Sequence, residues 1–69
     1  MNSERISMRQ LPSVVRALAE KETAGCELIE VEKEMKDGKV IYAVTYNEKG
    51  TEMELEYSED GILLSKAPE

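Results

Sequence analysis

The chain has 69 residues, 15 of them acidic and nine basic, and a formal charge of −6; it contains one cysteine and no histidine. This length allows one domain with a small core, and the negative charge disfavours nucleic acid as a partner while it suits a basic protein. A single thiol excludes an intrachain disulfide, a chain without histidine is expected to hold no metal or cofactor, and apolar runs of a few residues are too short for membrane insertion.

The first half of the chain predicts one helix after an irregular start. Residues 1–10 show no periodicity, so we expect a flexible lead-in there. Apolar residues then recur at the spacing of one helix face, at Leu11, Val14, Val15, Leu18 and Ala19. Pro12 suits the first helical position and Gly25 suits the residue just past the end, which predicts a helix from about Pro12 to Thr23.

The second half predicts four antiparallel strands joined by three tight turns. A residue followed by glycine suits the centre of a two-residue hairpin turn, and such pairs occur at Asp37-Gly38, Lys49-Gly50 and Asp60-Gly61. With these turns Val44 lies opposite Val31 and Leu55, Tyr46 lies opposite Ile29 and Met53, Tyr42 lies opposite Tyr57, and Tyr57 lies opposite Leu64. All three turns then place the apolar residues on one sheet face: Ile29, Val31, Met35, Val40, Tyr42, Val44, Tyr46, Met53, Leu55, Tyr57, Ile62 and Leu64.

The amphipathic helix is expected to cover this apolar face, because no other segment of the chain could do so. The expected fold class is α+β, with one N-terminal helix on a four-stranded meander of strand order 1-2-3-4. Residues 11–66 form the single domain in this scheme, and residues 67–69 form a C-terminal tail.

The opposite sheet face is expected to be acidic and to face water. Glutamates alternate along the first and third predicted strands, and the strand between them carries small or apolar residues. A solvated surface is the simpler interpretation, since charges there discourage aggregation. The alternative is a face that binds a basic protein partner, made by Glu30, Glu32, Ile41, Ala43, Thr45, Glu54, Glu56 and Leu63.

Several motifs of this chain, taken together in their order, resemble PepSY-like domains. They are a Leu-Pro that opens a helix with paired valines, a glycine shortly after it, an Asp-Gly-Lys turn followed by Tyr-x-Val, and a late Tyr-x-x-Asp-Gly. They stand at Leu11-Pro12, Val14-Val15, Gly25, Asp37-Gly38-Lys39, Tyr42-Ala43-Val44 and Tyr57 to Gly61. The resemblance spans about residues 11–64 and rests on the order of individually weak motifs.

The resemblance implies a fold shared with the repeats of beta-lactamase-inhibitor proteins, and an extracytoplasmic, non-catalytic protein. PepSY domains occur in the propeptides of peptidases and are thought to inhibit or chaperone them. Many relatives carry two such units, whereas this chain carries one, which suggests that a second copy could be recruited by self-association. The resemblance brings no catalytic residues to this chain.

Three other groups of residues carry chemically reactive or ligating side chains. Cys26 is expected to be an inert, partly buried thiol, because no imidazole is present to activate it; an intermolecular disulfide is the alternative. The aspartates Asp37 and Asp60 fit turns better than a calcium loop, which needs several oxygen ligands at alternating positions. Paired glutamates on an open sheet face lack the cleft that acid–base catalysis requires.

The sequence therefore predicts a protein-binding module that is not an enzyme, and the resemblance implies a peptidase or a cell-envelope protein as its target. The alternative of another class is a structural homodimer formed by strand-edge or sheet association, which would stabilise a small core by mass action. An enzyme that uses Cys26 or Glu54 is the third and weakest hypothesis.

Overall fold

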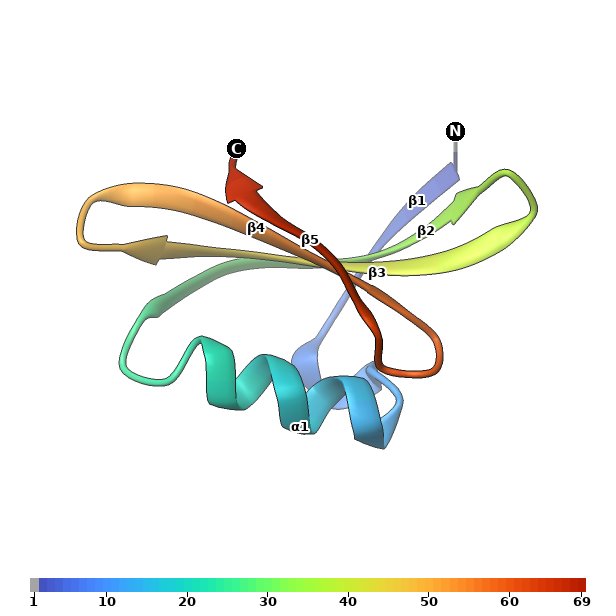
Figure 1. The fold of residues 1–69 in the computed structure, drawn as a ribbon, viewed down its shortest axis with the longest axis horizontal. Coiled ribbons are helices and arrows are strands. Elements are labelled where there is room, and N and C mark those ends of the chain that lie inside the picture. The colour runs from blue at the N-terminus through green and yellow to red at the C-terminus, as the bar shows by residue number, and fades with distance from the viewer. Residues whose placement is uncertain (1) are drawn as a thin grey trace.

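A computed structural model describes residues 2–69 as one helix packed on a five-stranded antiparallel sheet (Figure 1). The elements, in chain order, are β1 (Asn2–Ile6), a 3-10 turn (Met8–Gln10), α1 (Ser13–Glu22), β2 (Glu27–Lys36), β3 (Lys39–Glu48), β4 (Thr51–Ser58) and β5 (Leu63–Pro68). The strands lie in the sheet in the order in which they occur in the chain. The expected α+β class and the single helix are confirmed, and the sheet has one strand more than expected.

The additional strand, β1, lies where a flexible lead-in was expected. It pairs antiparallel with β2 from Asn2 opposite Met35 to Ile6 opposite Val31. Ile6 is the one apolar side chain of this strand, and it packs against the core. The expectation of a tail at residues 67–69 is also wrong, because β5 continues to Pro68 and the Glu69 N–H donates to the Glu52 carbonyl at 2.9 Å.

The first two hairpin turns form as predicted. Asp37 and Gly38 have φ of 52° and 76°, and Lys49 and Gly50 have φ of 52° and 88°, so both central residues of each turn are left-handed. Such turns match the twist of the strands that they join. The register that they set is confirmed, with Val31 opposite Val44 and Val44 opposite Leu55.

The predicted register fails where two irregularities interrupt the strand pairing. Between Leu28 and Glu30 the pairing with β3 shifts, so Leu28 rather than Ile29 lies opposite Tyr46. A second shift in β4 places Leu63 rather than Leu64 opposite Tyr57. The third turn is therefore not a two-residue hairpin: the Ser58 N–H donates to the Ile62 carbonyl at 2.9 Å, across a wider loop. A β-bulge of this kind is not evident from the alternation of apolar and polar residues in the sequence.

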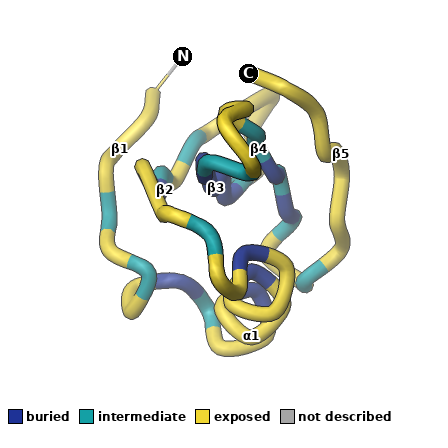
Figure 2. Tube along the Cα trace, turned by 90° about the vertical axis from the view of Figure 1, so that its left-hand side faces the viewer, coloured by how far each residue is buried: buried dark blue, intermediate teal, exposed yellow. Residues whose placement is uncertain are grey.

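The core lies between α1 and the central strands (Figure 2). Figure 2 also places β1 and β5 at the two flanks, where most of their residues are exposed. The buried apolar side chains on the helix side are Leu11, Val15, Ala19, Val31, Tyr42, Val44, Tyr46, Leu55 and Tyr57. Four residues expected on this face are largely exposed instead, because the bulges and the sheet ends carry them away from the helix: Ile29, Met35, Ile62 and Leu64.

The loop before β5 packs directly on the helix through Gly61. This residue has φ of 88°, and a Cβ at that position would lie 2.9 Å from a methyl group of Val14. Glycine is therefore required here both for its backbone conformation and for close contact. The contact fixes the start of β5 relative to α1.

Replacing Val44 by Asp should abolish cooperative unfolding of the domain. Val44 is fully buried at the centre of β3, and an unpaired buried carboxylate costs several kcal/mol, about as much as the ~3–5 kcal/mol that a core of this size supplies. Urea denaturation followed by circular dichroism measures this. Ile62→Asp is the matched control, because the same carboxylate then stands at a site that is 61% exposed. A folded Val44→Asp protein would contradict the assigned register.

Candidate protein-binding face

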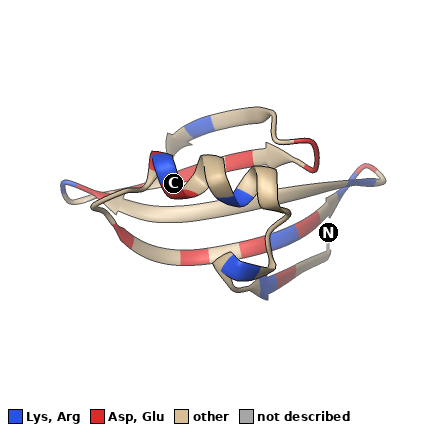
Figure 3. Cartoon of the chain, turned by 90° about the horizontal axis from the view of Figure 1, so that it is seen from below, with Lys and Arg blue, Asp and Glu red and all other residues tan. Residues whose placement is uncertain are grey.

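The acidic face is built by three strands whose register sets carboxylates on both sides of β3. Glu32 lies opposite Ala43, which lies opposite Glu56, and Thr45 lies in the same way between Glu30 and Glu54. Figure 3 shows acidic residues repeating along β2 and β4, with the strand between them nearly free of charge over its central part. We call this surface the acidic face: Glu30, Glu32, Glu34, Ile41, Ala43, Thr45, Glu54 and Glu56.

The floor of the acidic face is more buried than an open sheet surface would be. Ala43 is 1% exposed and Thr45 is 4% exposed, although the helix lies on the other side of the sheet. The glutamates beside them are themselves only partly exposed. Their methylene stems therefore cover β3 while their carboxylates reach water. The surface that was expected to face water is therefore half-buried.

The charges of this face are compensated on one side only. Arg5 of β1 forms an ion pair with Glu30 on the neighbouring strand. On the other flank the corresponding contact is neutral, since the Ser65 hydroxyl donates to Glu56 at 3.1 Å. Within residues 2–69 no lysine or arginine forms an ion pair with Glu32, Glu34, Glu54 or Glu56.

The uncompensated carboxylates act on one another across β3. Burial raises the pKa of Glu54, and the carboxylates of Glu56, Glu69, Glu34 and Glu32 raise it further. Burial likewise raises the pKa of Glu34, which Glu56 and Glu32 also raise and Lys36 lowers. Like charges held at short range in a half-buried site oppose ionisation, so this arrangement lowers the stability of the fold near neutral pH.

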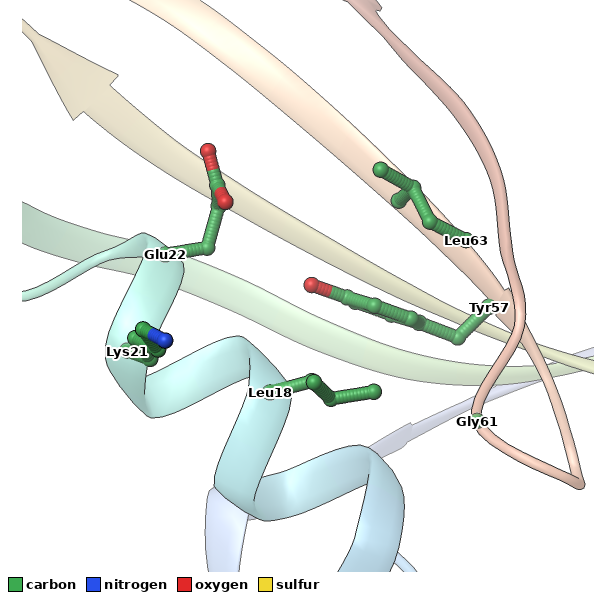
Figure 4. Close-up of a pocket in the computed structure, with 6 residues that line it drawn as sticks. All are labelled: Leu18, Lys21, Glu22, Tyr57, Gly61 and Leu63. Carbon is green, nitrogen blue, oxygen red and sulfur yellow. The ribbon is translucent and has the colours of Figure 1, made fainter.

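One residue assigned to this face by sequence lies elsewhere. Leu63 pairs with Tyr57 on the helix side, where both line a cavity of about 490 Å³ between α1 and β5. Figure 4 shows Leu18 and Leu63 on either side of this cavity, with the Tyr57 hydroxyl directed toward the end of α1 that carries Glu22. The lining has one carboxylate and one ammonium group, from Lys21, and no thiol. Nothing there pairs a nucleophile with a base.

An ion pair joins β5 to α1 beside this cavity. Lys66 of β5 binds Glu22 of α1 at 2.8 Å and thereby ties the edge strand to the helix. The hydroxyl of Tyr46 is buried nearby without a hydrogen-bond partner in the described part of the chain. Burial raises the pKa of Tyr46, and Lys66 lies close enough to lower it in part. We assign these groups to packing rather than to chemistry.

Cys26, Asp37 and Asp60 lie apart in the fold. Cys26 is half-buried against the core, as predicted, and the aspartates lie in separate loops. No group of three or more Cys, Asp and Glu side chains in residues 2–69 is arranged to hold a metal ion. None of the helices that these residues form is long and apolar enough to cross a membrane.

Sequence reasoning missed the residues that border the acidic face. Arg5 and Ser3 come from β1, and Ser65 and Ala67 come from β5. The alternation Ser3–Arg5 beside Ile6 was too short to predict a strand, while the late bulge hid which residues of β5 face the glutamates.

Comparisons with known proteins add no relative. No family model matches the chain, and neither a curated protein nor a solved structure matches it. The resemblance to PepSY-like domains therefore stays a prediction.

Replacing Glu54 by Gln should stabilise the domain near pH 7. The pKa of Glu54 is raised in the folded state, so its contribution to stability is fully present below the pKa of the unfolded chain and is lost as pH rises through the folded-state value. The gain over the parent should be about 0.2–1 kcal/mol at pH 7, the scale of screened surface charges, and should vanish below about pH 4. Thermal unfolding at several pH values measures it. Glu59→Gln in an exposed loop is the control, and equal gains from both variants would contradict the proposed repulsion.

Proposed function

We propose that this chain is a non-catalytic protein-binding module whose acidic face binds a basic partner. The observation that carries the proposal is the set of uncompensated, partly buried carboxylates on both sides of β3. The fold does not need them, because uncharged side chains would cover Ala43 and Thr45 as well and would avoid the mutual repulsion. A partner that supplies positive charge would remove that repulsion on binding.

The resemblance to PepSY-like domains suggests which partners to test first. PepSY domains are thought to inhibit or chaperone peptidases, so a peptidase or another cell-envelope protein is the proposed target, outside the cytoplasm. The net charge of −6 supports a basic surface on that target, since opposite charge speeds encounter and selects the partner.

Reversing Glu32, Glu54 and Glu56 to Lys should abolish partner capture and leave the fold intact. These side chains are partly exposed and make no ion pair that the fold depends on within residues 2–69. The measurement is a pull-down from a cell-envelope fraction with the immobilised domain, with a loss of at least tenfold in bound partner, because reversal changes each attraction into repulsion. Circular dichroism checks that the variant folds.

The control reverses Glu4, Glu20 and Glu59, which changes the net charge equally at exposed positions away from the acidic face. It should retain capture. Equal loss in both variants would show that only net charge matters, and undiminished capture by the first variant would exclude the acidic face as the binding surface.

A homodimer is the second candidate, favoured by one observation. All six residues of β5 are exposed, and no strand within residues 2–69 pairs with its outer edge. On the opposite flank β2, the first of the predicted strands, is covered by β1. Repulsion between two chains of charge −6 opposes this candidate, most strongly at low salt.

Sedimentation velocity over a tenfold range of concentration tests the homodimer. Because association follows mass action, the dimer should raise the sedimentation coefficient with concentration, and more so at high salt where the repulsion is screened. A single monomeric species at the highest concentration in both salts would exclude it.

A further inference from the structure

The outer edge of β5 is the least protected edge of the sheet. The opposite edge strand, β1, carries Glu4 and Arg5, charges that discourage pairing with another strand. In β5 the single charged residue, Lys66, is held by Glu22 of the helix. From Leu63 to Ala67 the outer edge therefore exposes backbone N–H and C=O groups that are unpaired within residues 2–69, and no free charged side chain of this stretch protects them.

The residues of β5 on the acidic face are small. Ser65 lies opposite Glu56 and Ala67 lies opposite Glu54, so the two uncompensated glutamates of β4 stand behind short side chains. On the other flank Arg5 shows how a cation from the next strand reaches this face, because it binds Glu30 of β2. A strand added beside β5 would lie two strands from β4, about 10 Å away, so its cationic side chains would have to be long and to extend over the short Ser65 and Ala67 to reach Glu56 and Glu54.

An apolar hollow lies at the Leu64 end of the same edge. It has a volume of about 520 Å³. Its apolar lining comes from Val40, Ile41, Ile62 and Leu64, and its polar rim comes from Lys39, Ser58, Glu59 and Asp60. Leu64 is 50% exposed, and Ile41 is the acidic-face residue opposite Glu34. A partner strand that runs along β5 past the carboxylates of β4 would reach this hollow, where it could place an apolar side chain.

A second copy of this chain suits this edge less well than a basic segment does. Its own edge strand β5 would bring Ser65 and Ala67 toward the glutamates and no free cation, since Lys66 is on the other face. Two acidic faces would also meet in one continuous sheet.

From these observations we infer that the basic partner binds by adding a strand to β5. An extended segment of the partner pairs with the edge from Leu63 to Ala67, sends alternate Lys or Arg side chains over Ser65 and Ala67 to Glu56 and Glu54, and places an apolar side chain in the hollow at Leu64. This inference rests on the proposed function and specifies its partner: a basic β-strand segment with an apolar end.

The probe is a fluorescein-labelled octapeptide that alternates lysine with threonine and carries isoleucine at both ends, with a matched peptide that carries alanine at both ends. Fluorescence anisotropy at low salt measures the binding of each. The isoleucine peptide should bind the parent domain about three- to tenfold more tightly, the effect of burying one apolar side chain in part.

The informative variant is Ala67→Arg, which supplies to Glu54 a cation from within the chain, as Arg5 does to Glu30. It should weaken peptide binding about tenfold, by loss of the ion pair and by repulsion of the lysines. Ala17→Arg is the matched control, with the same charge change on an exposed helix position, and should weaken binding about twofold at most through net charge. Amide hydrogen exchange provides a second readout: outward-facing amides of β5 should be protected when peptide is bound.

The outcomes separate this inference from the proposed function. If Glu54→Gln weakens binding but Ala67→Arg resembles Ala17→Arg and the β5 amides gain no protection, the partner covers the acidic face without adding a strand, and only the inference is overturned. If neither peptide binds, or binding ignores Glu54→Gln, the proposed function fails as well. Protection of β5 that grows with protein concentration in the absence of peptide would assign the edge to a second copy and overturn the inference.

Discussion

The structure depends on burying both faces of the central strand β3, although α1 covers only one of them. Val44 and Tyr46 point to α1 and are fully buried, and Ala43 and Thr45 on the reverse are nearly as inaccessible. A chain of 69 residues has no second layer to spare for the reverse face. The stems of glutamates from β2 and β4 serve as that layer, a task for which the stems are needed and the carboxylates are not.

Covering β3 with glutamates has an electrostatic cost, the repulsion among their carboxylates, and the ion pair at Arg5 relieves only part of it. Arg5 neutralises the β2 side at Glu30, while the β4 side is left with a hydroxyl from Ser65. Proteins commonly concentrate such local instability where they bind, because an interaction that removes it favours the complex. The asymmetry between the two flanks is the reason that we place the partner at β5 and not at β1.

Most of the sheet and little of its periphery could be predicted from sequence. The turns at Asp37-Gly38 and Lys49-Gly50 have strong local signals, and each one fixed the pairing of two strands. The bulges near Leu28 and Glu56 have none, so Leu63 was assigned to the wrong face. The strand β1 depends on pairing with a segment about thirty positions away, which single-sequence periodicity does not detect.

The position of β1 before the helix bears on the order in which the chain folds. The hairpins from β2 to β4 close through turns of two residues and can form early, whereas β1 must join Asn2 to Met35 across an intervening helix. Closing that longer loop costs entropy before any pairing is gained. Strand β1 is thus expected to be the last to find its place, which leaves the outer side of β2 uncovered while the rest of the sheet is already formed.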